Sequence, residues 1–294
     1  MESLPPTFLF MVSFLIPIYN YNIVALAQNL CKQAEQLSID YELLAIDDCS
    51  PNETIKQENK AIENLPNTRY ILLNTNFGRS KIRNFLANEA KGDWLLFLDC
   101  DTEIIKDNFV KSYLDNTDKA DVICGGIAYK DIKDVEKQFL LHTLFGTKRE
   151  SHKNHFMTGN FFIKKEIFSV VNFNENILGY GHEDTLFGIE LKDKNYTILC
   201  IDNSILHLGL KNTDKFIEDT IQACINLKKL YKNPDYHNKL ENLHIIKTYN
   251  KLHFKPLYRL ILNWFQPFCK QQLKSDTPKL FFLDLIKLNA ILKK

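Results

Sequence analysis

Residues 94–101, WLLFLDCD, decide the fold of this chain. Their five leading apolar residues form an uninterrupted run, which is typical of a strand buried on both faces in a parallel sheet. Asp99 and Asp101 follow at its carboxyl end, where open α/β sheets bind their ligands. Once the chain turns there, one carboxylate can hold Mg²⁺ or Mn²⁺ while the other reaches a ribose hydroxyl or the same ion. Two acids at a strand end are also common in solvated loops, so the rest of the chain must decide.

Strand and helix patterns alternate on both sides of this stretch. Strands are predicted at 12–18, 41–47, 69–73, 93–98 and 122–128, and helices at 23–37, 53–64 and 78–90. This alternation is typical of a mostly parallel sheet with right-handed crossovers. Further strands are predicted at 160–163 and 196–201, helices near Lys165 and at 183–191, and a mobile polar loop at 146–155. Because the pattern turns helical after residue 212, we predict an α/β domain over 1–212 and a helical region over 213–294.

The charge of the chain is unevenly distributed. The 294 residues carry a formal net charge of +1, but residues 228–294 hold 14 lysines and arginines against four acids. That basic end has a net charge of +10 and the preceding part −9, which favours contact of the basic end with an anionic surface. Seven scattered cysteines without a C-x-x-C pair, no basic leader and no apolar run of 18 residues predict a cytoplasmic protein without a membrane span.

Polar residues gather after four successive predicted strands, at 19–20, 47–50, 74–84 and 99–101. The carboxyl ends of parallel strands meet at one edge of a sheet, so these distant positions are expected to converge. The chain has neither a G-x-x-x-x-G-K-[ST] phosphate loop nor a G-x-G-x-x-G segment after a strand. The usual nucleotide-binding folds are therefore unsupported.

These segments resemble the family 2 glycosyltransferases of the GT-A fold. The resemblance is carried by residues 12–20, 42–50, 76–78 with 83–84, and 93–101, and it extends over residues 11–210. It implies an α/β fold with a mostly parallel mixed sheet flanked by helices, followed here by a helical C-terminal extension. It also implies transfer of a sugar from a nucleoside diphosphate donor with inversion at the anomeric carbon.

The resemblance implies a donor site and a metal site. Its donor-binding residues are Pro17, Tyr19, Asp48, Arg83 and Asp99, and its metal ligands are Asp99, Asp101 and His207. Asp48 would accept a hydrogen bond from uracil, which favours a UDP-sugar. The metal would be Mn²⁺ or Mg²⁺, which neutralises the diphosphate leaving group. As alternatives, Asp47 and Asp48 can cap their loop with Ser50, Arg83 can be a cation on a helix surface, and His207 can be a buried core residue.

Residues 178–185, LGYGHEDT, resemble the G-W/Y-G-x-E-D motif of β-galactosyl- and hexosaminyl-type transferases. Inverting transfer needs a carboxylate that takes the proton of the acceptor hydroxyl, and Asp184 matches that base. Glu183 would orient the acceptor, Tyr180 would pack on a sugar ring, and Gly181 would let the backbone pass close to it. Asn160 would hydrogen-bond the acceptor sugar or cap its segment. The alternative role for the two acids is the cap of a helix N-terminus.

Aromatic and basic residues are interleaved near the C-terminus, among them Tyr258, Trp264 and Phe268 with Lys255 and Arg259. Basic amphipathic helices with Trp and Phe can lie in a membrane interface. That placement would suit a lipid-linked acceptor at the inner leaflet. The alternative is a helical cap that packs on the sheet and turns its basic face to water.

Together these features predict a metal-dependent inverting glycosyltransferase of surface polysaccharide or glycolipid synthesis. It would move a hexose or N-acetylhexosamine from a UDP-sugar to a saccharide or lipid-linked acceptor, in the cytoplasm or peripherally on the inner face of the membrane, with no nucleic-acid partner. One rival is a sugar-1-phosphate nucleotidyltransferase, but residues 17–20 replace the glycine-rich basic loop of those enzymes. The other is a non-catalytic sugar-nucleotide-binding protein, which the loss of an acidic motif would favour.

Overall fold

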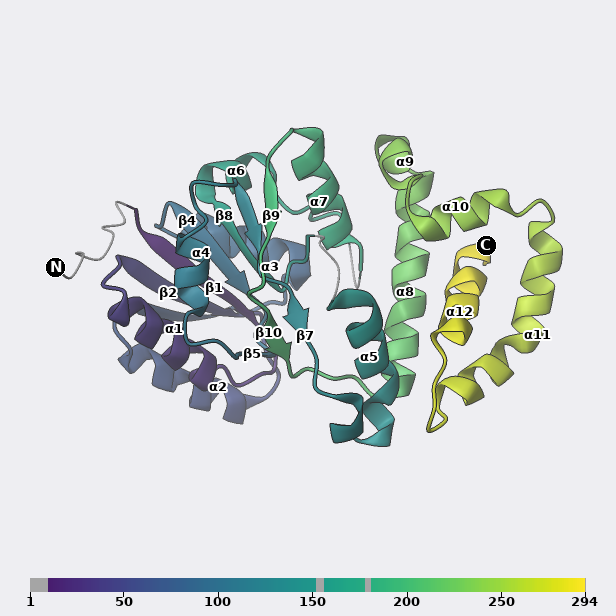
Figure 1. Cartoon of the computed structure of the whole chain (residues 1–294), viewed down its shortest axis with the longest axis horizontal. Helices are drawn as coiled ribbons and strands as arrows, with labels where there is room; N and C mark the ends of the chain where they lie inside the picture. The colour runs from purple at the N-terminus through teal and green to yellow at the C-terminus, as the bar shows by residue number, and fades with distance from the viewer. Residues whose placement is uncertain (1–9, 152–155, 178–180, 294) are drawn as a thin grey trace. The chain divides into compact units, whose positions relative to one another are not determined.

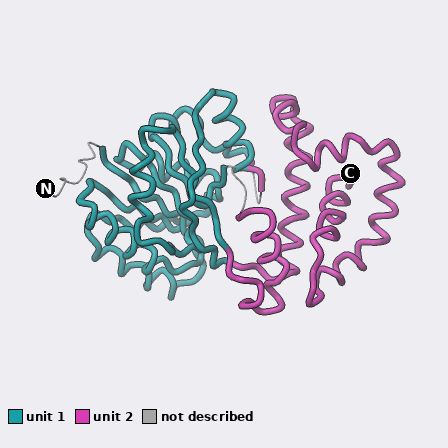
Figure 2. The backbone as a smooth tube through the Cα atoms, viewed as in Figure 1, with its two compact units in different colours: residues 1–128, 153–176, 183–209 teal, residues 129–152, 177–182, 210–294 magenta. Residues whose placement is uncertain are grey.

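The computed structural model describes residues 10–151, 156–177 and 181–293. The chain divides into two compact units, which Figure 2 colours separately. Unit 1 comprises residues 1–128, 153–176 and 183–209, and unit 2 comprises residues 129–152, 177–182 and 210–294. The division into domains at residue 212 stays a prediction.

The described strands of unit 1 form two sheets (Figure 1). The seven-stranded sheet has the order β3-β2-β1-β4-β8-β6-β9, with β1 (Val12–Ile18), β2 (Tyr41–Asp47), β3 (Thr68–Leu72), β4 (Trp94–Leu98), β6 (Val122–Cys124), β8 (Asn160–Lys164) and β9 (Ile198–Cys200). Strand β8 runs antiparallel to both neighbours and the other pairs are parallel. The small sheet has the order β5-β10-β7, with β5 (Thr102–Ile104), β7 (Ile127–Ala128) and β10 (Ile205–His207). The predicted mostly parallel mixed sheet is confirmed.

Helices cover both faces of the large sheet, which is why its central strands are largely apolar and β4 is apolar throughout. The helices of unit 1 are α1 (Val24–Gln36), α2 (Glu53–Asn59), α3 (Gly78–Glu89), α4 (Phe109–Leu114), α6 (Lys165–Val170) and α7 (Glu183–Asp193), with a 3₁₀ helix η1 (Lys60–Asn64). On one face, Phe97 of β4 stacks on Phe161 of β8 and Phe168 of α6, at ring distances of 4.7 and 5.1 Å. On the other face, Phe162 packs against Tyr113 of α4 at 5.4 Å.

The predicted strand 122–128 is wrong as a single element, because β6 and β7 belong to different sheets. The break falls at Gly125 and Gly126. A Cβ on Gly125 would lie 2.3 Å from the hydroxyl of Tyr113, and Gly126 has a φ of +84°. The two glycines therefore let the chain pass tightly over α4 and change sheets.

Unit 2 is helical. Its elements are two 3₁₀ helices, η2 (Ile132–Asp134) and η3 (Lys137–Phe139), α5 (Leu140–Phe145), the π-helix η4 (Gly146–Glu150), α8 (Thr213–Lys232), α9 (Pro234–Leu240), α10 (His244–Lys251), α11 (Lys255–Leu273) and α12 (Leu280–Leu292). Its core joins α5, α8, α11 and α12 through Leu141, Phe216, Cys269 and Ile286. The C-terminal helices α8–α12 confirm the predicted helical extension. Every helix in the described ranges is too short or too polar to cross a bilayer.

The predicted loop at 146–155 is wrong over 146–150, where the chain continues α5 as a π-helix. The segment lacks apolar periodicity because a polar contact anchors it. Arg149 donates two hydrogen bonds, of 2.6 and 2.7 Å, to the carboxylate of Asp284 on α12. Residues 152–155 lie outside the described residues.

Candidate active site

The carboxyl ends of β1 and β2 lie side by side in unit 1. Ile18 is the register partner of Asp47 in the parallel pair, and the Asp48 amide donates to the carbonyl of Ile18 at 2.8 Å. Beyond the strands, the amide of Asn20 donates to Ser50 Oγ at 2.7 Å. Strand β4 pairs with the other edge of β1. The strand ends that the sequence predicted to converge therefore form one edge.

The carboxylates of Asp47 and Asp48 accept hydrogen bonds from different parts of the chain. Asp47 is fully buried and accepts hydrogen bonds from the amide of Ser50 at 2.6 Å and the hydroxyl of Tyr70 at 3.3 Å. Asp48 accepts from the amides of Phe77 and Gly78 at 2.5 and 2.9 Å, where α3 begins. Burial raises the pKa of Asp48, although those two amides lower it. The loop-capping role that the sequence left open belongs to Asp47, and Asp48 ties the loop to the start of α3.

Arg83 points from α3 to the end of β4. Its side chain is buried, and its Nη2 donates to Asp99 Oδ1 at 2.5 Å. Its Nη1 donates to the carbonyl of Arg79 at 3.0 Å. These contacts exclude the interpretation of Arg83 as a cation on the helix surface. The Asp99 side chain keeps 31% of its surface exposed, so it is held by Arg83 yet accessible.

Asp101 and His207 come together through the small sheet. Strand β5 pairs antiparallel with β10, with Thr102 opposite His207, and the amide of Leu208 donates to the carbonyl of Asp101 at 2.8 Å. Asp101 Oδ1 lies 3.7 Å from His207 Nδ1. A Cβ on Gly209 would lie 1.9 Å from Asp101 Oδ2, so only glycine leaves room for this carboxylate. The last strand predicted from the sequence is 196–201, with His207 beyond it; this is wrong, because His207 ends the further strand β10.

The electrostatic surroundings of Asp101 are mixed. Burial and the neighbouring Asp99 carboxylate raise its pKa, and His207 and Arg79 lower it. Tyr21 follows β1, and the pKa of its phenol is raised. Burial is the main cause, and the negative charge of the nearby Asp101 adds to it. The surroundings thus place an imidazole, a guanidinium and a phenol about one partly buried carboxylate.

Arg79 is a site residue that the sequence analysis missed. Its Nη1 lies 3.5 Å from Glu183 Oε1 at the start of α7, and its charge also lowers the pKa of Asp101. Glu183 is buried, and its Oε2 has no hydrogen-bond partner among the described residues. The signal was present in the sequence, since a cation in the first turn of a helix opposes the helix dipole and needs another reason to be there.

Asp184 follows Glu183 in the first turn of α7. Its Oδ1 accepts from the amide and hydroxyl of Thr185, at 2.6 and 3.3 Å, and Oδ2 takes no part in those bonds. Both acids therefore sit at a helix N-terminus, as the capping alternative required, and that position also favours their negative charge. Gly181 has a φ of +100°, and a Cβ there would lie 2.6 Å from that of Ala223. Tyr180 lies outside the described residues.

The remaining predicted residues differ in their exposure. Tyr19 is 55% exposed just beyond β1, and Pro17 is half-buried within it. Asn160 is fully buried at the start of β8. Its amide donates to the carbonyls of Gly126 and Asn203 at 2.9 and 3.0 Å and accepts from Tyr113. These buried contacts favour the structural alternative for Asn160 over a contact with the acceptor sugar.

The donor set fits part of a metal site. Across the described ranges, no three His, Cys, Asp or Glu side chains are grouped closely enough to hold an ion. Mg²⁺ is usually bound by one or two carboxylates together with substrate phosphates, rather than by the protein alone. Asp101 supplies such a carboxylate, with His207 beside it and Gly209 leaving space. The pair therefore suits a cation that arrives with, or is completed by, a diphosphate.

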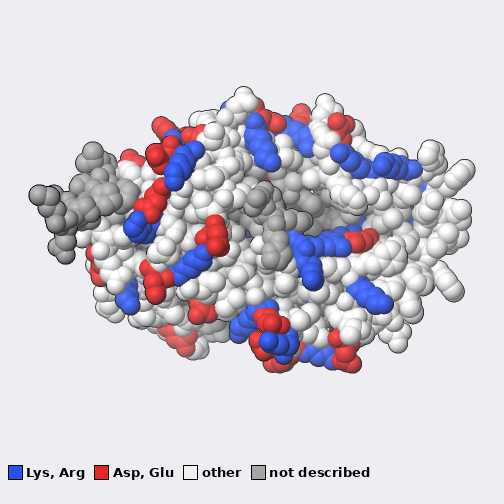
Figure 3. All heavy atoms as spheres, viewed as in Figure 1, with Lys and Arg blue, Asp and Glu red and all other residues white. Residues whose placement is uncertain are grey.

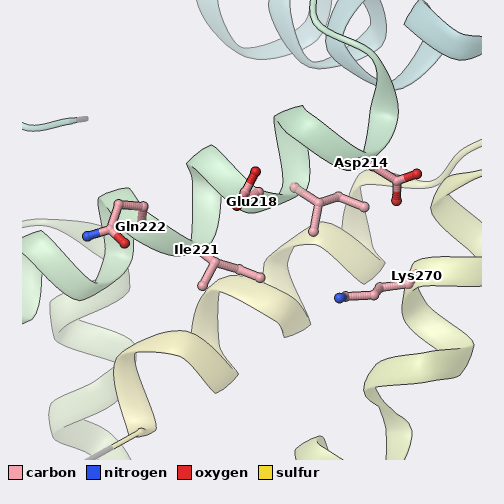
Figure 4. A pocket seen from close by; sticks show the side chains of 6 residues that line it. Asp214, Glu218, Ile221, Gln222 and Lys270 are labelled. Carbon is pink, nitrogen blue, oxygen red and sulfur yellow. The ribbon is translucent and has the colours of Figure 1, made fainter. Parts of the chain in front are cut away.

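A separate hollow of about 180 Å³ lies in unit 2. Figure 4 shows Asp214, Glu218, Ile221 and Gln222 along α8 and Lys270 on α11. None of the residues predicted for the donor, metal or acceptor lines this hollow.

Comparison with known proteins decides the family. The profile described as "Glycosyl transferase family 2" matches residues 13–173, more than half of the chain. The chain belongs to glycosyl transferase family 2. This family 2 chain is 34% identical over 93 residues to an uncharacterized glycosyltransferase of Haemophilus influenzae, covering 31% of the chain and 29% of that protein. It is 32% identical over 96 residues to the undecaprenyl-phosphate 4-deoxy-4-formamido-L-arabinose transferase of Proteus mirabilis, covering 31% and 29%. Each alignment spans less than a third of the relative.

Solved structures share the fold of this family 2 chain. The mannosyltransferase PcManGT of Pyrobaculum calidifontis, in complex with GDP-Man and Mn²⁺, superposes over 99% of the chain and 88% of its own, with a TM-score of 0.62 and 13% identity. TarS 1–349 of Staphylococcus aureus in complex with UDP gives 0.54 and 16%, over 96% and 89%. At these identities the likeness shows the GT-A-like fold alone.

Proposed function

We propose that this glycosyltransferase is inverting and metal-dependent, and that it moves a hexose or N-acetylhexosamine from a UDP-sugar to a saccharide or lipid-linked acceptor. One observation carries the proposal. The guanidinium of Arg79 contacts Glu183 and also lowers the pKa of Asp101. One cation therefore interacts with two acidic segments whose residues 101 and 183 are 82 positions apart in the sequence. Such convergence of titratable groups is typical of an active site.

The donor would bind at the ends of β1, β2 and β4. Tyr19 is exposed there and can contact the base, with Pro17 behind it. Asp48 would accept from uracil with the lone pairs that its two amide bonds leave. Arg83 holds Asp99 in position for the ribose or the cation. A divalent cation bound by Asp101 and His207 would neutralise charge on the departing diphosphate, and Arg79 adds a fixed positive charge beside it.

The acceptor would react at the start of α7. Asp184 would take the proton of the attacking hydroxyl, as a general base. The acceptor oxygen forms its bond to the anomeric carbon while the bond from that carbon to the phosphate oxygen breaks, which inverts the configuration and releases the nucleoside diphosphate. Glu183 is held by Arg79 and has one buried oxygen without a described partner. That oxygen can accept a hydrogen bond from a second acceptor hydroxyl. This pair of roles extends the resemblance to β-galactosyl- and hexosaminyl-type transferases.

The names of the relatives support the proposed classes of donor and acceptor. One solved neighbour is described in complex with UDP-GlcNAc, and a Staphylococcus aureus relative is a poly(ribitol-phosphate) β-N-acetylglucosaminyltransferase, 34% identical over 98 residues. The Proteus relative is named for a lipid-phosphate acceptor. We accordingly place this chain in synthesis of a surface polysaccharide or glycolipid, on the cytoplasmic side of a membrane.

A thermal-shift panel tests this function. The chain should be stabilised by one UDP-sugar among UDP-Glc, UDP-Gal, UDP-GlcNAc and UDP-GalNAc, and only with Mn²⁺ or Mg²⁺ present. At about 100 times Kd the ligand adds about 2.7 kcal/mol of stability, which raises Tm by about 5–10 °C. GDP-mannose and EDTA serve as controls. Stabilisation by a nucleoside triphosphate with a sugar phosphate instead would point to nucleotidyl transfer and contradict the proposal.

A further inference from the structure

Helix α11 of unit 2 exposes an apolar face. Its exposed large apolar residues are Leu257, Tyr258, Leu260, Ile261, Trp264 and Phe268, and they continue into Phe254 before the helix and Phe281 on α12. Leu260 and Trp264 are 69% and 81% exposed. Single exposed apolar residues are ordinary on a protein surface, but a contiguous group of this size marks an interaction site. We call these eight residues the α11 face.

The α11 face is distinct from the face that holds the helix in the fold. Residues 257, 261, 264 and 268 follow the three-to-four spacing of one helix face. Leu262, Cys269 and Leu273 lie elsewhere around the helix and are buried, and Cys269 and Leu273 belong to the core shared with α8 and α12. Removing Leu260 and Trp264, the two side chains of α11 that are most exposed, is therefore expected to leave the packing of unit 2 intact.

The surroundings of the α11 face are rich in basic residues, one of which, Lys274, pairs with Asp214 of α8 at 2.5 Å. Residues 242–275 contain six lysines and arginines and no Asp or Glu. Burial lowers the pKa of Lys228, and so do three neighbouring cations, which are Lys232 on α8 and Lys255 and Arg259 on α11. In Figure 3 the right-hand edge, where Figure 1 draws α11, is mostly uncharged, with lysine and arginine side chains beside it.

We propose that the α11 face lies in the interface of an anionic membrane. An amphipathic helix with Trp, Phe and Leu on one side and Lys and Arg beside them binds there through apolar burial and attraction to anionic lipid. A second copy of the chain would bring the same positive charge against this one, which disfavours self-association. The cationic ammonium and guanidinium groups reach phosphates while their aliphatic stems stay on apolar surface. This assignment concerns unit 2 alone and does not depend on the proposed reaction.

Vesicle sedimentation of the full chain tests the membrane assignment. The chain should bind phosphatidylcholine vesicles that contain phosphatidylglycerol, and bind pure phosphatidylcholine vesicles at least about ten-fold more weakly. The double substitution Leu260→Ser with Trp264→Ser should weaken binding to the anionic vesicles by about ten-fold or more. Lys255→Gln with Arg259→Gln should weaken the same binding by about ten-fold and remove part of its salt dependence. The matched control is Val170→Ser in unit 1, which also removes an exposed apolar side chain, 56% exposed, and should bind as the unaltered chain does.

Tryptophan fluorescence gives a second readout. The chain has two tryptophans, and Trp94 is buried in β4 whereas Trp264 is exposed on the α11 face. Anionic vesicles should shift the emission to shorter wavelength, and Trp264→Phe should abolish the shift while most of the binding persists. Equal loss of binding with Val170→Ser, or unchanged binding in the Leu260/Trp264 variant, would overturn the proposal. So would a concentration-dependent dimer, seen by light scattering, that Trp264→Ser dissolves while vesicle binding is absent.

Discussion

Replacing Asp184 by Asn is expected to lower sugar transfer by about 10²-fold or more while donor affinity stays unchanged. The amide keeps the size of the carboxylate and can still accept from Thr185, whose amide and hydroxyl bond Asp184 Oδ1. It has lost the ability to take a proton from the acceptor hydroxyl. The loss should therefore appear in kcat with acceptor saturating, and the Tm shift caused by donor and Mn²⁺ should be the same in both proteins.

The control for this variant lies at the other end of the same helix. Asp193 is an exposed carboxylate in the last turn of α7. Asp193→Asn should leave transfer unchanged, because its carboxylate is distant along the helix from the reacting group. If Asp184→Asn turns over at the normal rate, Asp184 is not the base and its role is confined to capping α7.

The second large effect is expected from Asp101→Asn, which should lower metal-dependent hydrolysis of the donor by at least about 10²-fold. A neutral amide is a far weaker ligand for Mn²⁺ or Mg²⁺ than a carboxylate. The backbone bond from Leu208 to the carbonyl of residue 101 remains, and so does the space that Gly209 leaves. The variant should therefore fold, with a Tm close to that of the unaltered chain when donor and metal are absent.

Donor hydrolysis is measured as release of UDP with and without Mn²⁺, since this readout needs no acceptor. Asp107→Asn removes an exposed carboxylate six positions away and should leave the rate and its metal dependence unchanged. Undiminished, metal-dependent release of UDP by Asp101→Asn would place the cation on other residues.

The sequence predicts the large sheet well because its strands are buried on both faces. All five residues of β4 are buried and form a continuous apolar run, and all seven of β2 are buried, with an apolar run at 43–46. The small sheet escapes prediction. Strands β5 and β10 have three residues each and β7 has two, so none carries a periodic pattern. The π-helix η4 was not predicted for another reason. It is anchored by the ion pair of Arg149 with Asp284, and a local sequence pattern carries no information about a partner 135 positions away.

In the candidate site, too, local sequence patterns predict some features and not others. The rule that ligands bind at strand ends predicts the positions of Asp48, Asp99 and Asp101 from local pattern alone. It cannot predict what each carboxylate of a pair bonds. In the fold, Ser50 and Tyr70 bond Asp47, whereas the amides at the start of α3 bond Asp48. Long-range pairing is also needed to bring Arg79 to Glu183, 104 positions later.

Residues from separate strand ends are expected to assemble about one bound cation and its diphosphate. The most direct measurement is the anomalous scattering of manganese in crystals of the chain grown with UDP and Mn²⁺. We expect a single strong peak at about 2 Å from a carboxylate oxygen of Asp101, with His207 and the UDP phosphates as further ligands. A peak bound elsewhere, or UDP bound at full occupancy with no manganese near Asp101, would contradict it.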